Sequence, residues 1–349
     1  MDARPPICLV YTLAVEIKNE GVVLRRSRCR QVSPYLPQRY TFIGTESAPN
    51  WHQTAPNVLP PVVVGAGPAG LFATLLLARA GLRPILLERG QPVEQRQKDV
   101  ENFWSGGPLL PNSNVQFGEG GAGAFSDGKL NTGTKDPRHR FILEELVSCG
   151  APESILVDAK PHVGTDMLHI TLKNMRKKLL SLGADIRFGH RLEGIETRQG
   201  QLTGISVAHG EEIYALPVRN LILALGHSAR DTVERLYGQG LFMEAKPFAV
   251  GVRIEHLQSR MDAVQYKEYA GHPALPVSSY KLSCHLPDGR GVFSFCVCPG
   301  GQVVAAASEP RRTVTNGMSE YARSGENING GLLVGVSPRD FGSDHPLAG

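Results

Sequence analysis

The sequence lacks any apolar run of the length that a transmembrane helix needs, about 20 residues. Its N-terminus is also unlike a secretory signal, because the apolar stretch from Ile7 to Val15 is interrupted by Tyr11 and Thr12 and is followed by Glu16. We therefore expect a protein with no membrane span, located in the cytoplasm.

The cysteines are few and scattered, and they show neither a disulfide framework nor a zinc motif. A reducing compartment fits this pattern. His256 and His285 have no partners at metal-ligand spacing, so we predict no metal site. The six cysteines are Cys8, Cys29, Cys149, Cys284, Cys296 and Cys298.

Charge of one sign does not dominate the chain, which has 37 Lys and Arg against 33 Asp and Glu, a net charge of +4. This excess is too small to indicate nucleic acid, and no basic surface with interleaved aromatic residues is evident. The sequence also has no G-x-S-x-G motif, no paired carboxylates and no P-loop. We expect a small-molecule substrate and no nucleic-acid partner.

The composition is that of a globular protein, and the clearest sequence pattern in the chain is one βαβ unit. Its 349 residues, of which 41% are hydrophobic, suffice for two or three domains. The unit reads PVVVGAGPAGLFATLLLARAGLRPILLERG from Pro61 to Gly90. Val62–Val64 predict a buried strand, and an apolar helix follows from about Ala69 to Ala80. Pro84–Leu87 predict a second strand that ends at Glu88.

The turn between the first strand and the helix has the spacing of a dinucleotide-binding loop. Gly65 allows a tight turn, Gly67 lets a pyrophosphate approach the backbone, and Gly70 lets the helix pack closely on the sheet. The free N–H groups at the helix start attract phosphates. Glu88 can accept hydrogen bonds from ribose hydroxyls and would repel a 2′-phosphate. The motif therefore disfavours NADP at this site.

A second unusual stretch is Asn112–Leu130, NSNVQFGEGGAGAFSDGKL. So dense a glycine run weakens packing and needs a reason. One interpretation is a mobile surface loop. Val115, Phe117 and Phe125 recur within it, unlike a Gly/Ser linker, and we favour contact of its backbone with a large planar ligand and its phosphates.

The rest of the chain alternates between helical and strand patterns. Asp166 and Ser228 are the predicted N-caps of two helices. Upstream, alternation from Leu9 to Ile17 predicts a strand with one buried face, and Gly44–Pro61 is predicted to be a linker. The other predicted elements are helices over Gln91–Trp104, Pro137–Cys149, Asp166–Leu182 and Ala229–Tyr237, a strand and β-meander over Asp185–Leu216, a buried strand over Asn220–Gly226, and a mostly antiparallel sheet containing Val250–Ile254, Val292–Phe295 and Val303–Ala306.

This order resembles the FAD domain of the glutathione-reductase type. The resemblance implies an α/β fold: a glutathione-reductase-type FAD-binding Rossmann domain, an inserted mostly antiparallel β substrate domain, and a small N-terminal α/β remnant. It places the pyrophosphate at the glycine turn, the adenosine ribose at Glu88, adenine near Leu192 and the ribityl-phosphate side under Ala224–Gly226. The cofactor-binding residues predicted from motif and resemblance are Gly65, Gly67, Pro68, Ala69, Gly70, Glu88, Arg89, Gln116, Phe117, Gly118, Gly120, Gly121, Gly123, Lys129, Leu192, Ala224 and Gly226.

Longer phrases resemble a family of FAD-dependent dehydrogenases known in bacteria and plastids, the NAD(FAD)-utilising dehydrogenases. They are VQFGEGGAGAFSDGKL (115–130), LGHSARDT (225–232), AKPFAVGVRIEH (245–256), FSFCVCPGG (293–301) and TNGMSEYARSGEN (315–327). The resemblance implies bound FAD and redox chemistry. Because only one dinucleotide motif is present, NADH or NADPH would act as a transient reductant.

Against the family pattern, both ends are shorter than expected. The predicted domains are a small N-terminal segment with a linker (1–57), the FAD-binding domain with its glycine-rich insertion (58–244) and an incomplete substrate domain (245–349). In domains of this type a late segment brings a helix N-terminus to the flavin, where reduced flavin is negatively charged. We therefore expect a chain truncated at its C-terminus.

Three residues are candidates for catalysis. Cys296 and Cys298 stand two apart on a predicted strand, so both thiols would share one face and could exchange electrons or form an adduct with a flavin. The alternative is two small buried residues before a turn. His227 follows the second glycine turn and could lie near the flavin, although a histidine there usually makes a local bond. Lys129, which closes the glycine-rich run, could bind phosphate, stabilise reduced flavin or remain solvated.

The leading hypothesis is an FAD-dependent oxidoreductase that passes a hydride through flavin N5 to a small, unsaturated organic substrate. One alternative is a flavin-dependent RNA-modifying enzyme, whose relatives share this FAD domain but which the weak net charge disfavours. The other is a truncated, non-catalytic flavoprotein remnant, suggested by the missing C-terminal segment.

Overall fold

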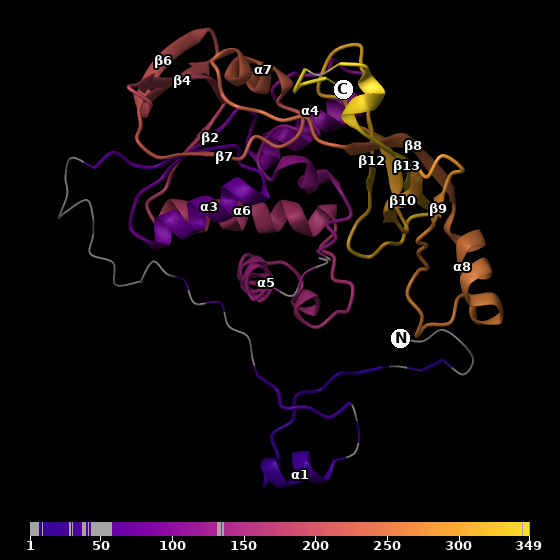
Figure 1. Ribbon diagram of the computed structural model, residues 1–349. Coiled ribbons are helices and arrows are strands. Elements are labelled where there is room, and N and C mark those ends of the chain that lie inside the picture. Colours follow the sequence, from indigo (N-terminus) through magenta and orange to yellow (C-terminus); the bar gives the residue numbers. More distant parts are fainter. Residues whose placement is uncertain are drawn as a thin grey trace.

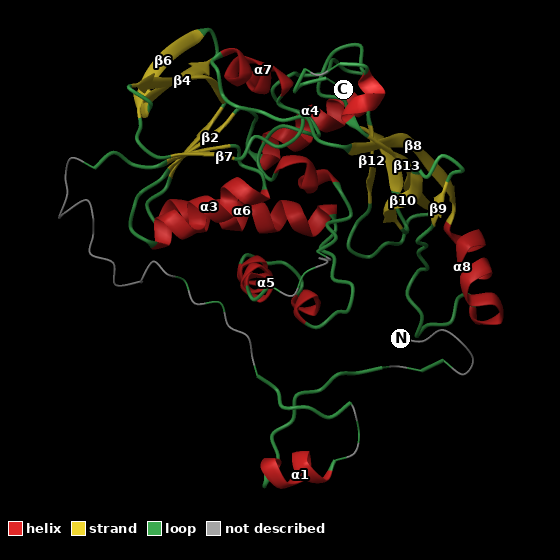
Figure 2. Ribbon diagram, in the orientation of Figure 1, coloured by secondary structure: helices red, strands yellow, loops and turns green. Residues whose placement is uncertain are grey.

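The fold is seen in a computed structural model, which is mixed α/β with one parallel sheet and several antiparallel sheets (Figures 1 and 2). The structure describes residues 7–8, 10–27, 29, 31–36, 40, 42, 58–130, 134, 136–343 and 345–348. The predicted linker lies mostly outside these residues.

The parallel sheet confirms the predicted βαβ unit. Its strand order is β3-β2-β1-β7, and Val62 of β1 pairs with Ile85 of β2 on one side and with Leu221 of β7 on the other. β1 and β2 are buried throughout, which explains their continuous apolar sequence. The strands are β1 (Val62–Val64), β2 (Ile85–Glu88), β3 (Asp185–Phe188) and β7 (Leu221–Leu223), and helix α3 (Pro68–Arg79) connects β1 to β2.

The two faces of this sheet are covered differently, because successive side chains of a strand point to opposite faces. Val63 and Leu86 pack against helices, whereas Val62 and Leu87 pack against a meander. Figure 1 shows α3 and α6 together on one side of the sheet and the meander with α7 on the other. The helices are α4 (Val93–Trp104), α5 (Arg138–Ser148), α6 (Thr165–Ser181) and α7 (Arg230–Gly238), and the meander is β4 (His190–Arg198), β5 (Gln201–His209) and β6 (Glu212–Pro217).

A second, antiparallel sheet has the strand order β8-β13-β10-β9, and a two-stranded sheet of β11 and β12 lies beside it. The antiparallel sheet was predicted, but its central strand β13 was not, because Gly330 and Gly331 in its middle weaken the strand pattern. The elements are β8 (Phe248–Leu257), α8 (Gln258–Tyr266), β9 (Ser283–His285), β10 (Gly291–Cys298), β11 (Gln302–Ala305), β12 (Thr315–Met318) and β13 (Asn327–Val336), with short 3-10 turns η1 (Gly121–Phe125), η2 (Glu153–Leu156), η3 (Lys267–Tyr269) and η4 (Pro338–Phe341).

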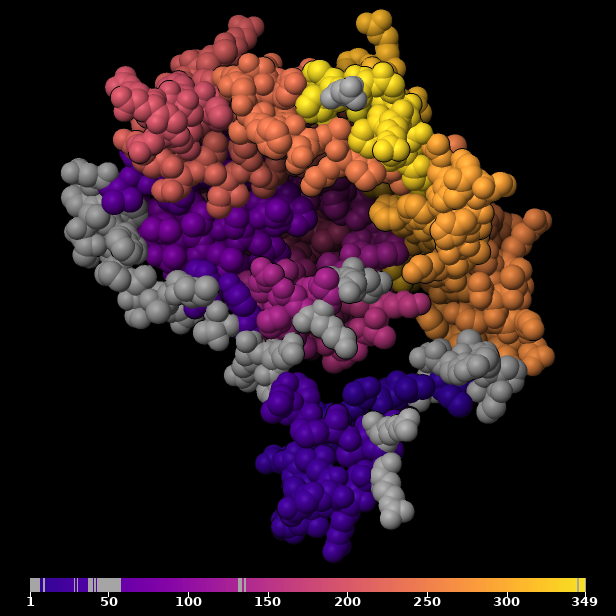
Figure 3. Space-filling model, viewed as in Figure 1, coloured from indigo at the N-terminus to yellow at the C-terminus, as the bar shows by residue number. Residues whose placement is uncertain are grey.

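Three local predictions are wrong. No strand forms over residues 10–17, where Tyr11 is 73% exposed, because no strand in the described part of the chain pairs with these alternating apolar residues. The described part of this region forms only α1 (Glu20–Arg26), which buries no residue and lies apart from the body (Figure 3). The N-caps of α6 and α7 are Gly164 and Ala229 rather than the predicted neighbours.

Asp166 and Ser228, the two residues predicted as N-caps, form hydrogen bonds with other segments instead. The Asp166 carboxylate accepts the Tyr321 N–H at 2.9 Å, and the Ser228 hydroxyl lies 3.4 Å from Gln116 Oε1. Across the parts of the chain that the structure describes, no helix combines the length and apolarity that crossing a bilayer requires.

Candidate functional site

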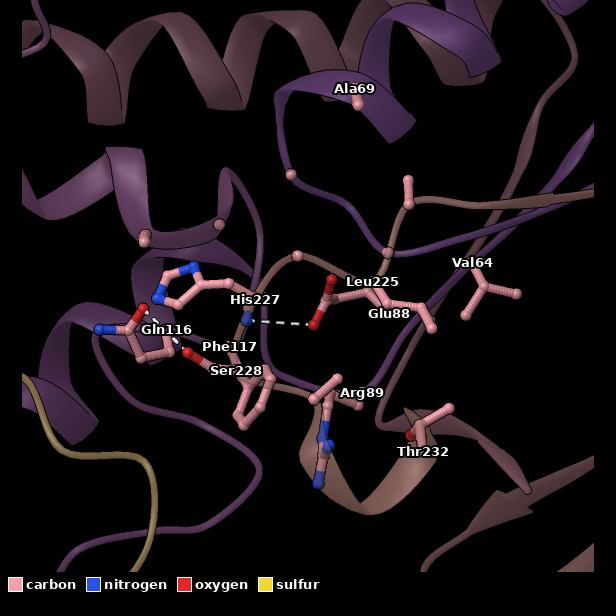
Figure 4. A pocket seen from close by; sticks show the side chains of 18 of the residues that line it. Val64, Ala69, Glu88, Arg89, Gln116, Phe117, Leu225, His227, Ser228 and Thr232 are labelled. Atoms are coloured by element: carbon pink, nitrogen blue, oxygen red, sulfur yellow. Dashed lines mark hydrogen bonds between the residues drawn. The ribbon is translucent and has the colours of Figure 1, made fainter. Parts of the chain in front are cut away.

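A cavity of about 530 Å³ opens at the carboxyl ends of β1, β2 and β7. This is where open parallel sheets bind ligands, and the volume is within the range of small-molecule sites. Figure 4 shows Glu88, Arg89, Gln116 and His227 around it. The predicted site residues that line the cavity are Gly65, Gly67, Pro68, Ala69, Glu88, Arg89, Gln116, Phe117, Gly118, Gly121, Gly123, Leu192, Ala224, Gly226 and His227.

Gly65 and Gly70 are glycines because of the protein's own packing. Gly65 has a φ of +103°, and a Cβ built on it would lie 2.3 Å from the Ala224 carbonyl oxygen. A Cβ on Gly70 would lie 1.7 Å from the Gly65 carbonyl oxygen. These contacts agree with the predicted roles in the turn and in helix packing. Gly70 is buried and does not line the cavity.

Gly67 differs, because no contact among the residues that the structure describes requires a glycine there. Its φ is −72°, which any residue adopts, and a Cβ would meet only the Gly121 Cα, at an ordinary 3.9 Å. The residue lines the cavity and is the N-cap of α3, whose first turn has no side-chain cap and no acidic residue. The missing side chain therefore leaves space beside a helix N-terminus, where backbone N–H groups and the helix dipole favour an anion.

Glu88 binds three separate segments of backbone. Its Oε2 accepts the Ala66 N–H at 2.7 Å, and its Oε1 accepts the N–H groups of Gly90 at 2.8 Å and Gly118 at 3.0 Å. The carboxylate is 5% exposed. A carboxylate can accept about four hydrogen bonds, so capacity for one more remains. Glu88 therefore joins the glycine turn to the glycine-rich run and still faces the cavity.

Arg89 forms one rim of the cavity. Its guanidinium lies 4.1 Å from the ring centroid of Phe117, pairs with Asp231 at 2.8 Å and donates to Asn112 Oδ1 at 2.9 Å. Burial raises the pKa of Asp231, but the hydrogen bond and charge of Arg89, together with the Thr232 N–H and the Arg191 charge, outweigh it and lower that pKa. The side chain is thus held by its neighbours against the wall of the site.

The glycine-rich run is shaped by a buried cation, Arg96, which belongs to no sequence motif. Arg96 of α4 is fully buried and donates to the carbonyl oxygens of Asn114, Val115, Glu119 and Gly121 at 2.6 to 2.9 Å. Burial lowers the pKa of its guanidinium to about 10, although nearby carboxylates act in the other direction. In a trans peptide, C=O and N–H point opposite ways. Because these carbonyls face Arg96, the N–H groups that follow them face away from it.

We expect Arg96→Met to lower the free energy of unfolding by about 3 kcal/mol, since four buried carbonyls lose their donor. FAD affinity should fall at least tenfold because the run loses its shape. Urea denaturation and titration of flavin fluorescence measure the two effects. The control is Arg140→Met, which removes an exposed arginine that pairs with Glu144 and should change stability by less than about 1 kcal/mol. Equal effects of both variants would contradict this prediction.

The glycine-rich run, which forms part of the cavity wall, is hydrogen-bonded to the segment around β11 and β12. Gln116 Nε2 donates to the Ala306 carbonyl oxygen at 3.0 Å, and Asn316 Nδ2 donates to the Phe125 carbonyl oxygen at 2.9 Å. His227 lines the cavity near Gln116, as Figure 4 shows. Two stretches of the glycine-rich run are thus tied to segments that lie some 190 residues further along the chain.

Besides Gly70, two predicted cofactor-binding residues, Gly120 and Lys129, lie outside the cavity, and so do both candidate cysteines. Gly120 packs beneath the wall, where a Cβ would lie 2.3 Å from Leu172 Cδ1. Lys129 does not line the cavity: its ammonium pairs with Asp127 at 2.7 Å and lies 3.8 Å from Cys298 Sγ. Cys296 and Cys298 end β10 and do not line the cavity either.

His190 and Arg191 line the cavity beside Leu192 but were not predicted as side-chain participants. His190 stacks on His209, with ring centroids 4.2 Å apart. A lone histidine or arginine at a strand start carries no motif, so only the pairing of β4 with β5 reveals this wall. Among the described residues, no three His, Cys, Asp or Glu side chains lie close enough to hold a metal ion.

Comparison with known protein families gives two matches. Residues 58–99 match the FAD binding domain, and residues 247–349 match the family described as FAD-dependent protein, C-terminal domain-like. An uncharacterized protein of Clostridium beijerinckii is 51% identical over 290 residues, covering 83% of this chain and 54% of the relative. The chain therefore spans about half the length of this curated relative.

Among solved structures, the glycerol-3-phosphate dehydrogenase of Bacillus halodurans complexed with FAD is 14% identical, with a TM-score of 0.39, covering 84% of this chain and 51% of that one. THI4 of Thermovibrio ammonificans is 18% identical, with a TM-score of 0.36, covering 54% of this chain and 66% of that one. These likenesses are too weak to support an argument. Residues 58–99 are thus similar to an FAD binding domain, and residues 247–349 are similar to the C-terminal domain of FAD-dependent proteins.

Proposed function

We propose that this chain is an FAD-dependent oxidoreductase of the NAD(FAD)-utilising dehydrogenase family, acting on a small, unsaturated organic substrate. The observation that carries the proposal is Gly67, a glycine at a helix N-terminus whose missing side chain leaves space for a ligand phosphate in the cavity. When bound, FAD would supply hydride transfer through its N5. The proposed arrangement is a glutathione-reductase-type FAD domain over 58–244 and a substrate domain over 245–349.

In this proposal the lining of the cavity would hold successive parts of FAD. The N–H groups at the start of α3 would hold the pyrophosphate, with Gly67 leaving room for it. The free acceptor capacity of Glu88 suits a ribose hydroxyl. The wall of His190 and Leu192 would take the adenine, and Ala224–Gly226 would flank the ribityl side.

The segment around β11 and β12, with the antiparallel sheet beside it, would cover the cavity next to Gln116 and exclude water from the substrate. Its support is the pair of hydrogen bonds that Gln116 and Asn316 make between the glycine-rich run and the segment around β11 and β12. His227 lies at the same end and is a candidate to orient the substrate or the cofactor. Water exclusion protects reduced cofactors from side reactions.

The test is the visible absorption spectrum of the purified chain, with and without added FAD. We expect flavin bands that remain with the protein through gel filtration. NADH and NADPH are then added anaerobically, and bleaching of the flavin band identifies the reductant. A protein that stays colourless and cannot be reconstituted with FAD would contradict the proposal. If FAD binds but neither NADH nor NADPH reduces it, the binding site is still supported. A nicotinamide nucleotide is then refuted as the reductant.

A further inference from the structure

One face of the antiparallel sheet β8-β13-β10-β9 is apolar and exposed. Every second side chain of a strand points to the same face. On β8 the residues of one face are all apolar, and each is more than a third exposed: Phe248, Val250, Val252 and Ile254. Val252, in the middle of the strand, is 65% exposed. An antiparallel sheet that faces water normally presents polar side chains on that side, so this row marks a surface that another molecule covers.

The strand register extends the row across the whole sheet. Residues directly opposite each other in an antiparallel pair have their side chains on the same face. Val250 is opposite Val334 of β13, and Val334 is opposite Val292 of β10. Val292 is in turn opposite Cys284 of β9. We call this surface the apolar face; it comprises Phe248, Val250, Val252 and Ile254 of β8, Leu332 and Val334 of β13, Val292 of β10 and Cys284 of β9, none of which is charged.

The pairing that builds this face is regular only as far as Phe295. Beyond it, β10 and β13 shift register before Cys298, and Cys296 has a φ of +44°, in the left-handed region. This bulge interrupts the regular alternation from which both thiols were expected on one face. The apolar face therefore ends before the two cysteines.

The opposite face of the same sheet is covered by the protein itself. Arg253 Nη1 donates to Asn329 Oδ1 at 2.7 Å on that face, and a Cβ built on Gly317 of β12 would lie 2.3 Å from the same oxygen. Glu255, which shares this face of β8, accepts the Val303 N–H of β11 at 3.2 Å. β11 and β12 thus pack against this side and leave the other side of the sheet bare.

The bare area has the size of a protein interface. Among the residues that the structure describes, rings stack at its two ends, Phe341 on Phe248 and Tyr280 on His256, and the middle stays exposed. The eight residues of β10 span about 27 Å, and four strands about 4.8 Å apart span roughly 15 Å. The area of roughly 400 Å² is within the range of apolar patches that serve a function, and it suffices for the core of an interface of about 800 Å² per partner.

We propose that the apolar face binds a second copy of this chain and forms a two-fold symmetric dimer in which the two faces pack against each other. An uncharged apolar surface is complementary to itself, whereas a charged partner would find no opposite charge on it. A two-fold axis through the face places each side chain against the same set on the other copy. Two sheets packed in this way lie about 10 Å apart, as in a β-sandwich. The proposal is independent of FAD.

The test measures the mass of the full chain by gel filtration with light scattering, from about 1 to about 100 μM. We expect twice the mass of one chain at the upper end of this range. Val252→Asp should raise the dimer dissociation constant at least about 100-fold, because each copy would bury an unpaired carboxylate. The matched control is Val157→Asp, which makes the same change at an exposed valine outside the sheet and should leave the dimer intact. Thermal unfolding checks that both variants fold.

Cys284 gives a second, independent readout, because it lies on the apolar face and is exposed in the single chain. Its labelling by iodoacetamide, followed by mass spectrometry of peptides, should be about fivefold slower at the high protein concentration than at the low one. The exposed Cys29 of the N-terminal segment should react at the same rate at both. Val252→Asp should remove the protection of Cys284.

Two results would overturn the proposal. One is a chain that stays monomeric at about 100 μM with Cys284 still reactive, which would leave the apolar face to a different partner. The other is a set of larger oligomers that Val252→Asp does not dissociate, because their contacts would lie elsewhere. Neither result bears on the flavin bands of the same preparation, so the dimer and FAD binding are tested separately.

Discussion

Replacing Glu88 by alanine is expected to lower the free energy of unfolding by about 5 kcal/mol, because three buried N–H groups lose their acceptor at 1 to 3 kcal/mol each. This is a large part of the stability of a typical protein. The groups belong to Ala66, Gly90 and Gly118, so the loss would also separate the glycine turn from the glycine-rich run. FAD binding should disappear with it. Urea denaturation measures the first effect and flavin retention the second.

Glu88→Gln refines the test, because the amide places an N–H₂ group against one of the three donors. We expect a loss of roughly 3 kcal/mol. The matched control is Glu101→Gln on α4, where an exposed carboxylate accepts one side-chain hydrogen bond from Gln97. This change should stay within about 0.5 kcal/mol. A Glu88→Gln protein as stable as the control would mean that the three contacts do not hold the site together.

Gly67→Asp is expected to weaken FAD binding about 1000-fold with little effect on folding. The new carboxylate would lie beside the pyrophosphate, and like charges some 4 Å apart repel by roughly 4 kcal/mol at an effective dielectric constant near 20. Folding should survive, because a Cβ at this position meets only an ordinary contact at 3.9 Å. Flavin fluorescence titration gives the Kd, and thermal unfolding in the absence of FAD gives the stability.

Two further variants serve as comparisons for Gly67→Asp. Gly21→Asp makes the same chemical change on α1, where a Cβ meets nothing within 4 Å, and should leave the Kd unaltered. Gly70→Ala should instead unfold the domain, since its Cβ would overlap the Gly65 carbonyl oxygen. An FAD Kd for Gly67→Asp within threefold of the unaltered chain would refute the assignment of the cavity to the pyrophosphate.

The βαβ unit was predictable from the sequence because its information is local. Val62–Val64, the glycine turn and Glu88 lie within one short stretch, and each has the residue type that its own backbone or ligand demands. The same holds for α3, which begins one residue before its predicted start. By contrast, the strand predicted between Leu9 and Ile17 is wrong wherever it is described, since an alternating pattern forms a strand only when another strand pairs with it.

Much of the site depends on contacts between distant residues. Arg96 donates to carbonyl oxygens of the glycine-rich run, and Glu88 accepts an N–H group from the same run. Both contacts require the run to fold back over the glycine turn. The Lys129 side chain contacts Cys298 instead of the cavity, and these two residues are 169 positions apart in the sequence. No spacing rule covers such distances, because the chain can close loops of that length in many ways at similar entropic cost.

The amino-acid sequence by itself therefore determined the nucleotide-binding unit, the order of the main elements and most of the cavity lining, since these follow from periodicity and from residues that need special backbone space. Only the tertiary structure decided that Glu88 also binds three backbone segments, that Arg96 shapes the glycine-rich run, and that Lys129 lies against Cys298 beside the bulge at Cys296. Those features arise from side chains meeting across separate elements, and their geometry exists only once the sheets have packed.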